Sequence, residues 1–533
     1  AVIKASYRMN ISKKHLLEWT TSEEADRQSK KTLISYYQSM IANVVIGTGG
    51  LIIAFISKSY GIKIFFAVLS ALWLIAPFIM YILGKNIEKK DAITKLDKNE
   101  KEYLYDVGRR TWLFFKSYLN EKGNFLPPDN YQEDRNPKVV YRTSSTNIGL
   151  GLLAVVSSYD MGYESKIDTI NLLEKMINTI MRLSKWNGHL YNWYNIENLE
   201  PLIPRYVSTV DSGNFIGYMY VVKQFLINTK VETVENRSEN DGLDVQKIEA
   251  MIQNIDNIIQ NTDFSILYSE ENKIFSIGYN VEENMLTDSY YDLLASEARQ
   301  ASIVAIAKKD VPAKHWYSLN RSLTILNKYK GLISWSGTAF EYLMPNVNIL
   351  QEEGSLLSES CKFAIMSQME YAKKLNLPWG ISEAAFNLRD LNNNYQYKAF
   401  GIPWLGIKRG LGDEFVVSPY ASILAITQKP KEVYDNLKRL EDYGMYQKYG
   451  FYESIDYTPS RLKLNEQYSA VKTYMAHHQG LILLSINNLF NQNILQKRFM
   501  QNPEMSAVEI LLEERMPQNV IITKEEKEKV EKI

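Results

Sequence analysis

Two apolar stretches close to the N-terminus constrain the fold of this chain more than any other feature. Residues 41–57 and 62–84 contain no acidic residue, and Lys58 and Lys63 are the only basic residues between positions 41 and 84. At about 1.5 Å of rise per residue, a helix over the second stretch can cross a hydrocarbon layer of ~30 Å, whereas the first stretch is shorter and is interrupted by glycines. We therefore expect a hydrophobic helical hairpin over 41–84 that contacts or spans a membrane. The alternative is a buried hairpin packed against the rest of the chain.

Basic residues flank this hairpin on both sides. Lys30 and Lys31 precede the first stretch, and Lys85, Lys89 and Lys90 follow the second. If both stretches span the membrane, the two flanks lie on the same side, which the positive-inside rule makes cytoplasmic. We therefore predict a location at the cytoplasmic membrane, with the following domain on the cytoplasmic side. The sequence begins without a methionine, and we expect it to be a piece of a longer protein.

After residue 95 the sequence has the three-four spacing of apolar residues that is typical of helices, with little of the alternation typical of strands. The predicted helices cover residues 98–120, 165–184, 244–261, 289–308, 313–330, 355–375, 418–442 and 474–490. Long segments between them are rich in Trp, Tyr, Asn, Asp, Gly and Pro, and such long loops in a compact domain are usually functional. The pattern predicts an all-α fold, a toroid of paired helices with the loops on one face. We divide the chain into an arm (1–95), a catalytic domain (96–522) and a charged tail or linker (523–533).

Several functional classes lack support in the sequence. The 61 Lys and Arg balance the 61 Asp and Glu, which argues against a nucleic-acid partner, and no phosphate-binding loop or dinucleotide fingerprint predicts a cofactor. Cys361 is the single cysteine and falls in an apolar helical pattern, so it is expected in the core. Adjacent histidines on a helix point about 100° apart, so His477 and His478 suit a hydrogen-bonding or substrate-orienting pair better than a metal site. We expect neither metal nor cofactor.

Carboxylates and aromatic residues in loops remain, and this combination suits carbohydrate. Sugar rings stack on Trp and Tyr, while their hydroxyl groups bind Asp, Glu, Asn and Arg. The chain contains 36 Tyr and 9 Trp, and it offers several glutamates in such segments. Glycosidic chemistry needs two carboxyl groups that flank the scissile bond.

Three glutamates are candidates for this chemistry. Glu297 is predicted within the apolar face of a helix, where an unpaired carboxylate is costly; a structural pair with an arginine is the alternative. Glu383 is predicted in the first turn of a helix beside Trp379. The alternative is that a glutamate occurs there only because the helix dipole favours an acidic residue in the first turn. Glu453 suits a hydroxyl-binding acid in a loop. The residues alone do not rank the three.

A set of longer motifs resembles the middle region of cyclic β-1,2-glucan synthases. The motifs occur in order, and the resemblance runs from about residue 10 to about residue 517. This region of the family is similar to glucoamylase-like domains and to glycoside hydrolase family 189. Besides the segments around the three glutamates, the motifs are RTW (110–112), FLPPDN (125–130), RTSSTNIG (142–149), YNWY (191–194), VDSGN (210–214), WSG (335–337), YQYKAFG (395–401), LGIKRG (405–410) and MAHHQG (475–480).

The resemblance implies a fold and a reaction. It implies an (α/α)6 barrel that cyclises linear β-1,2-glucan by anomer-retaining transglycosylation through a glycosyl-enzyme. In the family this domain lies between a membrane-bound glycosyltransferase, which elongates the glucan, and a phosphorylase-like domain. Two other readings remain open: an endo-β-1,2-glucanase, in which water replaces the sugar acceptor, and a non-catalytic glucan-binding spacer.

The resemblance also implies roles for individual residues. Glu297 is implied as the nucleophile and Glu383 as the general acid/base. If the acid acts directly, the two carboxyl groups should lie ~5–5.5 Å apart; a proton relay through a sugar hydroxyl would allow a longer separation. The remaining candidates are expected to bind substrate: Arg142, Trp193, Asp211, Trp335, Trp379, Tyr395, Tyr397, Lys408, Glu453 and Tyr457.

Overall fold

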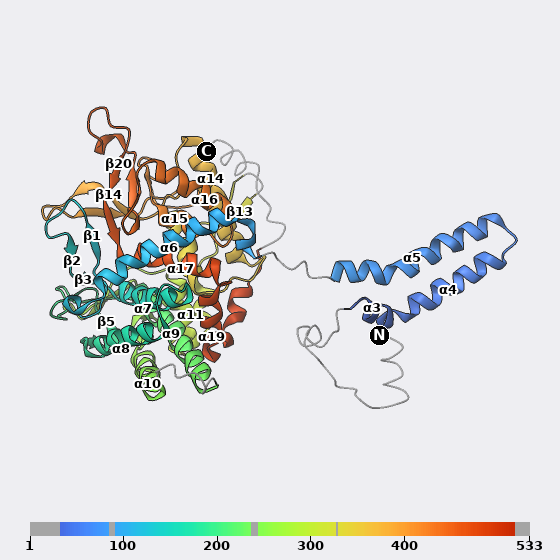
Figure 1. Ribbon diagram of the computed structural model, residues 1–533, viewed down its shortest axis with the longest axis horizontal. Helices are drawn as coiled ribbons and strands as arrows, with labels where there is room; N and C mark the ends of the chain where they lie inside the picture. Colours follow the sequence, from blue (N-terminus) through green and yellow to red (C-terminus); the bar gives the residue numbers. More distant parts are fainter. Residues whose placement is uncertain (1–31, 85–90, 236–243, 327–328, 517–533) are drawn as a thin grey trace. The chain divides into compact units, whose positions relative to one another are not determined.

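The computed structural model describes residues 32–84, 91–235, 244–326 and 329–516, and the chain divides into two compact units, Ala1–Lys90 and Asp91–Ile533 (Figure 1). The predicted charged tail and the basic flanks of the hairpin lie outside the described residues.

The first unit contains the predicted apolar hairpin. Helices α4 (Ile41–Ile56) and α5 (Tyr60–Gly84) pack side by side and follow the short helix α3 (Leu33–Ser39). A Cβ atom on Gly50 would lie 2.3 Å from Oγ of Ser70, so α4 and α5 approach closely here without displacing the Ser70 hydroxyl.

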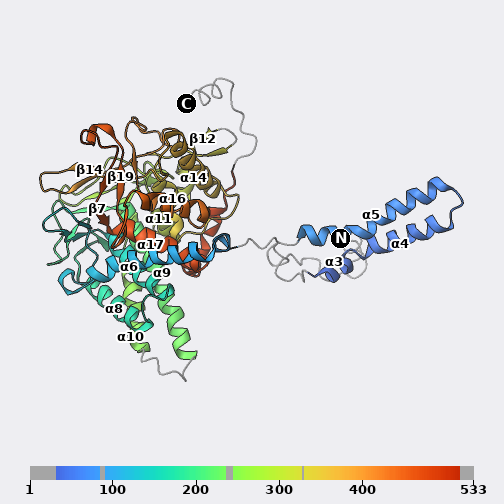
Figure 2. The ribbon, with the colours of Figure 1, turned by 45° about the horizontal axis from the view of Figure 1, so that its top comes forward.

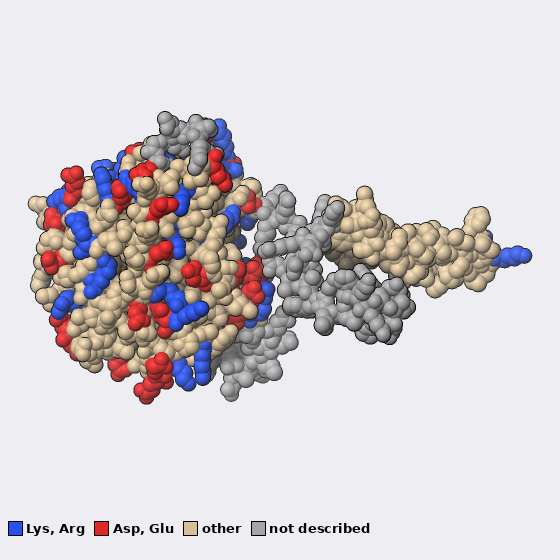
Figure 3. Space-filling view, turned by 90° about the horizontal axis from the view of Figure 1, so that it is seen from below, with Lys and Arg blue, Asp and Glu red and all other residues tan. Residues whose placement is uncertain are grey.

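Most apolar side chains of this hairpin are exposed within the unit. Figure 3 shows the hairpin almost free of charged atoms except at one end, whereas acidic and basic side chains are interspersed over the second unit. Within the described ranges, the segment Tyr60–Leu83 is long and apolar enough to cross a membrane. Helices α3 and α4 meet at a bend of 75°, and they pass the same test only when the two are taken together as one span. Length and composition alone carry this inference.

The second unit is mainly helical. Helices α7, α9 and α17 are buried along most of their length, and α7 packs on both α9 and α17, whereas α8 and α10 bury one face and expose the other. Cys361 on α14 is buried in the core, as predicted. The helices are α6 (Lys98–Tyr118), α7 (Ser145–Asp160), α8 (Lys166–Arg182), α9 (Thr209–Glu235), α10 (Val245–Asn261), α11 (Arg299–Ala307), α12 (Lys314–Ser318), α13 (Ala339–Leu343), α14 (Leu356–Leu375), α15 (Pro419–Ile423), α16 (Pro430–Asp442), α17 (Ala476–Phe490), α18 (Ile494–Met500) and α19 (Pro503–Ala507).

Short antiparallel strands fill the segments between these helices, and Figures 1 and 2 show many of them gathered on one side of the unit. The strands are numbered along the sequence, and hydrogen-bonded neighbours in each sheet follow the orders β2-β1-β21, β11-β10-β7, β16-β19-β20, β12-β13, β14-β15, β17-β18, β3-β6, β4-β5 and β8-β9. The strands are β1 (Asn130–Gln132), β2 (Val139–Val140), β3 (Arg142–Thr143), β4 (Lys185–Trp186), β5 (His189–Leu190), β6 (Tyr194–Asn195), β7 (Tyr206–Ser208), β8 (Tyr268–Ser269), β9 (Ile274–Phe275), β10 (Gly278–Asn280), β11 (Met285–Leu286), β12 (Leu323–Leu326), β13 (Tyr329–Leu332), β14 (Ala384–Arg389), β15 (Tyr395–Lys398), β16 (Val416–Val417), β17 (Tyr446–Gln447), β18 (Gly450–Phe451), β19 (Ser454–Asp456), β20 (Ser469–Val471) and β21 (Thr473–Met475).

Three of the predicted helices are wrong in part, and the all-α prediction omits these strands. The segment 289–308 is helical only in α11, Arg299–Ala307. The segment 313–330 is helical only in α12 and then forms the hairpin of β12 and β13, because β13 packs against α14 and a short apolar run fits a strand as well as a helix. The segment 418–442 is two helices, with Pro430 at the start of the second, where its missing N–H costs nothing. Strands of two to six residues are too short to give a clear alternating pattern.

Candidate active site

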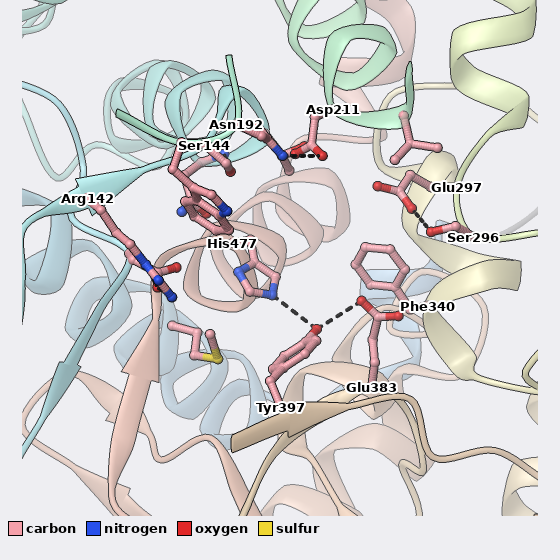
Figure 4. A pocket seen from close by; sticks show the side chains of 16 residues that line it. Arg142, Ser144, Asn192, Asp211, Ser296, Glu297, Phe340, Glu383, Tyr397 and His477 are labelled. Atoms are coloured by element: carbon pink, nitrogen blue, oxygen red, sulfur yellow. Dashed lines mark hydrogen bonds and ion pairs between the residues drawn. The ribbon is translucent and has the colours of Figure 1, made fainter. Parts of the chain in front are cut away.

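A cavity of about 340 Å³ collects side chains from segments far apart in the sequence (Figure 4). They come from β3, from the N-terminal turns of α7 and α9, from the turn before α11, from the region of β14 and β15, and from the junction of β21 with α17. The lining residues are Asp129, Arg142, Ser144, Thr146, Asn147, Asn192, Trp193, Val210, Asp211, Ser296, Glu297, Phe340, Glu383, Tyr397, Met475 and His477.

Glu297 lies in a turn directly before α11, so its predicted place in the middle of a helix is wrong. Ser296 has a left-handed φ of 53°, and α11 begins only at Arg299. The carbonyl of Leu294 accepts a hydrogen bond from the backbone N–H of Trp335 (3.2 Å), so a tertiary contact takes an acceptor that a helix would use internally. Of the apolar residues that suggested a helix face, Leu293 and Leu294 are buried in the turn, whereas Ala301 and Val304 lie on α11.

Polar donors surround the Glu297 carboxylate. Nδ2 of Asn214 donates to Oε1 at 2.8 Å, and the Ser296 hydroxyl donates to Oε2. Burial raises the pKa of Glu297 and the charge of Asp211 adds to this rise, whereas the hydrogen bonds from Ser296 and Asn214 lower it. The two donors stabilise the anion that burial disfavours.

A close contact between α9 and α11 brings Asn214 to this carboxylate. A Cβ atom on Gly213 would lie 2.4 Å from Cα of Ala301, so only glycine lets the two helices meet here. Asn214 Nδ2 also donates to Thr146 Oγ1 (3.1 Å), which fixes the amide between α7 and the turn before α11.

Glu383 directly precedes strand β14, so its predicted place in the first turn of a helix is wrong. Ala384 and Ala385 pair with Lys398 and Tyr397 across the hairpin of β14 and β15. This pairing is tertiary information that the local Gly-Ile-Ser-Glu pattern does not contain. The same register places Tyr397 beside Glu383, and its hydroxyl donates to Oε1 at 2.9 Å.

The surroundings of Glu383 favour its protonated form. The pKa is raised to about 8, first by burial and then by the charge of Glu297, while the hydrogen bond from Tyr397 lowers it. At neutral pH the cavity therefore contains one carboxyl group that keeps its proton, and a second one that accepts hydrogen bonds from two donors. This division of roles is what acid-base chemistry on a glycosidic bond requires.

Polar and aromatic groups from β3 and the segment before β6 also line the cavity. Nε and Nη2 of Arg142 donate to Oδ2 of the buried Asp129 at 3.0 and 2.9 Å, and the guanidinium lies 4.8 Å from the ring centre of Trp193. Asn192 Nδ2 donates to Oδ2 of Asp211 at 2.8 Å. A flat ring beside fixed hydrogen-bonding groups suits a pyranose.

Of the predicted site residues, six line this cavity: Glu297, Glu383, Arg142, Trp193, Asp211 and Tyr397. Trp335, 57% exposed, lines a second cavity of about 130 Å³, together with Asp292, Asn320 and residues of the turn that precedes α11.

The other predicted site residues line neither cavity. Trp379 is buried and its backbone N–H donates to Oδ1 of Asn436. The Tyr395 ring lies against Arg389, Lys408 donates to the Ala399 carbonyl, and Tyr457 packs against other tyrosines. Glu453 is buried behind Tyr397, where it contacts His478.

Sequence reasoning missed most of the polar lining. Asp129, Ser144, Asn147 and Asn192 lie inside motifs quoted above, so the motif residues themselves were the available signal. His477 was noted as a possible orienting residue, and its Nε2 lies 3.3 Å from the Tyr397 hydroxyl. Within the part of the chain that the structure describes, no group of three His, Cys, Asp or Glu could hold a metal ion.

Comparisons with known proteins show what this chain is similar to. Residues 289–503 match the family model Glycoamylase, described as "Putative glucoamylase". The chain is 31% identical, over 98% of its length, to the cyclic beta-(1,2)-glucan synthase NdvB of Rhizobium meliloti (strain 1021), and it spans 22% of the length of that relative.

Solved structures with the same fold include two bacterial proteins. An endo-beta-1,2-glucanase from Chitinophaga pinensis, in complex with sophorotriose and glucose, has a TM-score of 0.61 at 16% identity and matches 78% of this chain and 98% of its own. A protein described as "putative glucoamylase" from Bacteroides fragilis has a TM-score of 0.63 at 18% identity, with 80% of this chain and 99% of its own covered. The chain is thus homologous to a segment of cyclic β-1,2-glucan synthase and contains a glucoamylase-like, glycoside hydrolase-like domain.

Proposed function

We propose that this domain is an anomer-retaining transglycosylase that acts on linear β-1,2-glucan and cyclises it by intramolecular transfer. The observation that carries the proposal is the pair of carboxyl groups in one cavity with different surroundings. Glu297 accepts hydrogen bonds from Asn214 and Ser296, while the pKa of Glu383 is raised to about 8. The homology to NdvB supports β-1,2-glucan as the substrate, since that relative is a cyclic β-(1,2)-glucan synthase.

In the first step, Glu297 attacks the anomeric carbon of an internal glucosyl unit. The glycosidic bond breaks, its electron pair goes to the leaving oxygen, and Glu383 donates its proton to that oxygen. The products are a covalent glycosyl-enzyme ester and the released reducing-end fragment. The proton passes directly or through a sugar hydroxyl that contacts Glu383.

In the second step, a hydroxyl group at the non-reducing end of the bound chain attacks the anomeric carbon. Glu383, now a carboxylate, takes the hydroxyl proton, the ester bond breaks, and Glu297 is released as an anion. Two inversions give net retention, and the ring closes when donor and acceptor belong to the same chain.

The remaining lining residues are proposed to hold the glucan. Trp193 and Arg142 offer a ring and a cation beside the cavity, and Asp211 is the acid next to Glu297. We assign Trp335 and its small cavity to a more distant glucosyl unit, because an exposed indole beside polar groups suits a sugar face. The helices of the unit are proposed to form an (α/α)6 toroid around this site.

The context of the domain is part of the same proposal. The chain spans 22% of the NdvB length, so we propose that it works beside glycosyltransferase and phosphorylase-like domains of one polypeptide. The exposed apolar hairpin supports attachment to the cytoplasmic membrane, with the domain on the cytoplasmic side.

Hydrolysis is the second candidate. It is favoured by the fold similarity to an endo-beta-1,2-glucanase in complex with sophorotriose and glucose. The two activities differ only in whether water or a sugar hydroxyl resolves the ester, which depends on how well bound glucan excludes water.

The test is incubation of the purified domain with linear β-1,2-glucan, followed by mass and anomer analysis of the products. Rings and transfer products of retained configuration are expected from the wild type, and none from Glu297→Gln. Reducing oligosaccharides alone would replace the proposal by an endoglucanase. An inert domain that still binds glucan would make it a binding spacer.

A further inference from the structure

A row of side chains leads from Glu383 into the interior of the domain. The Tyr397 hydroxyl donates to Glu383 Oε1 at 2.9 Å, and its oxygen lies 3.4 Å from Nε2 of His478. On the other side of that ring, Nδ1 lies 2.9 Å from Oε1 and 3.0 Å from Oε2 of Glu453. Each neighbouring pair is within hydrogen-bonding distance, so the four groups form a continuous chain from cavity to core.

The inner half of this row is buried and rigidly held. The side chains of His478 and Glu453 are each 1% exposed. The ring of Tyr420 stacks on that of His478 with centres 3.6 Å apart, and the backbone N–H of Ala385 donates to Glu453 Oε1 at 3.1 Å. A buried acid beside a buried imidazole is costly to keep. The sequence prediction of Glu453 as a hydroxyl-binding residue does not account for this position, because Glu453 does not line the cavity.

The direction of every hydrogen bond in the row depends on one proton. If Glu453 is protonated, it donates to Nδ1, the ring proton of neutral His478 sits on Nε2 and is donated to the Tyr397 oxygen, and the Tyr397 proton points to Oε1 of Glu383. The acidic proton of Glu383 then belongs on its other oxygen, Oε2, where it is free to reach the substrate.

If Glu453 is ionised, the row reverses. The ring proton then sits on Nδ1, the Tyr397 hydroxyl donates to Nε2 of His478, and the Tyr397 oxygen is left to accept, from Glu383 or from Nε2 of His477 at 3.3 Å. The Glu383 proton is drawn toward Tyr397 and away from the substrate.

We propose that Glu453 and His478 are positioning residues that orient the Tyr397 hydroxyl toward Glu383 and thereby keep the acid proton on the oxygen available to the leaving group. The inference rests on the proposed function, because it assigns Glu383 the role of general acid.

Other ionisable groups act on the same row. Burial raises the pKa of Glu453 to about 7 and lowers that of His478 well below its usual value, so Glu453 rather than His478 changes charge near neutrality. The charge of His477 opposes the rise at Glu453, and Asp129 in turn acts on His477. The groups that act on Glu383 from neighbouring elements are Glu297, Tyr397, Glu341 and Glu453.

Two substitutions of Glu453 form a matched pair. Glu453→Gln and Glu453→Leu both remove the charge, so they change the electrostatic potential at Glu383 alike. Only glutamine can accept from the Ala385 N–H and donate to Nδ1 of His478, as the protonated glutamate does.

We expect Glu453→Gln to keep kcat within about 3-fold of wild type at pH 6, and Glu453→Leu to lower it about 100-fold with KM within 2-fold, since misplacing a catalytic group by ~1 Å can cost ~100-fold. Equal loss in both variants would overturn the proposal and point to a charge effect. Wild-type kcat in both would overturn it as well.

Tyr397→Phe covers the case in which Glu453→Leu does not fold. The hydrogen bond from Tyr397 lowers the pKa of Glu383, so its removal should move the alkaline limb of kcat to higher pH while kcat falls at least 10-fold. A fall in kcat with an unmoved limb would contradict the inferred contact.

A readout without substrate separates this inference from the proposed function. The chain has five histidines, so 15N NMR of labelled histidine, with His478→Asn for assignment, can follow the His478 tautomer. We expect Nε2–H at pH 6 and Nδ1–H above pH 8 in the wild type, and Nε2–H at both in Glu453→Gln. The inference is overturned if the His478 tautomer is the same at pH 6 and above pH 8 and does not change in Glu453→Gln, whether or not the domain acts on glucan. A domain inert on glucan with the expected tautomers overturns only the proposed function.

Discussion

Two walls of the cavity differ in the number of hydrogen-bond donors that they give to a carboxyl group. The first wall is built from α9 and the turn before α11, and the second from β14 and β15. On the first wall, Asn214 and Ser296 both donate to Glu297. On the second, Tyr397 is the one donor to the Glu383 carboxyl among the described residues, and burial followed by the charge of Glu297 raises the pKa of Glu383 to about 8. Burial acts in the same direction on both, so the number of donors and the order of ionisation separate an anion from an acid in one cavity.

Glu297→Gln should have the largest effect, because it removes the first wall's anion. We expect transglycosylation to fall at least about 10⁴-fold, since no covalent intermediate can form. The same variant removes the charge that raises the pKa of Glu383, so that pKa should fall. Product assays measure the first effect and 13C NMR of labelled glutamate the second.

The exposed Glu271→Gln, in the turn between β8 and β9, is the matched control and should behave as wild type. More than a tenth of wild-type activity in Glu297→Gln would remove Glu297 as nucleophile.

Glu383→Gln should have the next largest effect, a loss of about 10²–10⁴-fold in kcat, because general acid catalysis contributes on that order. In the wild type the protonated form is the active one, so activity should be present below about pH 8 and lost above it. The rate profile of kcat against pH checks this limb. An alkaline limb that survives unchanged in the residual activity of Glu383→Gln would mean that another group sets it.

Removing the donors of the first wall should make it resemble the second. Asn214→Ala and Ser296→Ala each delete a hydrogen bond that lowers the pKa of Glu297, so that pKa should rise. Because Glu297 must be an anion, the acid limb of kcat/KM should move to higher pH, with the larger loss of activity on the acid side of the profile.

Ser117→Ala, on the exposed side of α6, is the matched control for loss of a hydroxyl group. An acid limb that stays in place in both Asn214→Ala and Ser296→Ala would show that the two donors do not set the charge of Glu297.

Trp335→Ala should have the smallest effect, because this side chain lines the second cavity and not the first. We expect KM for long β-1,2-glucan to rise about 3- to 10-fold with kcat nearly unchanged, as stacking is worth roughly 0.5–1.5 kcal/mol. Kinetics on a short and a long glucan show whether Trp335 contacts a distant glucosyl unit or the reacting one. An equal change of KM on both glucans would place Trp335 at the reacting unit.

Much of the fold could be predicted from residue spacing. The helices α6, α8, α10 and α14 coincide closely with predicted segments, because each buries one apolar face and keeps the spacing that such a face requires. The hairpin of β12 and β13 was predicted as a helix, since its apolar residues gain their partner only from α14. Strands this short depend on neighbours that spacing does not reveal.

The sequence predicted many of the residue types of the candidate site, but only part of their positions in space. The two glutamates and the pair of histidines were singled out from their motifs, and Glu297, Glu383 and His477 line one cavity. Trp379 lies beside Glu383 in sequence but lines neither described cavity, because the backbone after Gly380 leads into β14 and not into a helix.

Residue spacing and motifs were enough to predict an apolar hairpin joined to a mainly helical domain with carboxylates and aromatic residues in its loops, because both are local properties. Only the tertiary structure decided that Glu297 lies in a turn, that Glu383 precedes a strand, and that Glu453 lies behind Tyr397 and His478. Those positions follow from three tertiary contacts: the packing of α9 on α11, the pairing of β14 with β15, and the contact of Glu453 with α17. The residues in contact are between 14 and 88 positions apart in the sequence. Hydrogen bonds and burial across such separations set the protonation of each carboxyl group, and no local pattern encodes them.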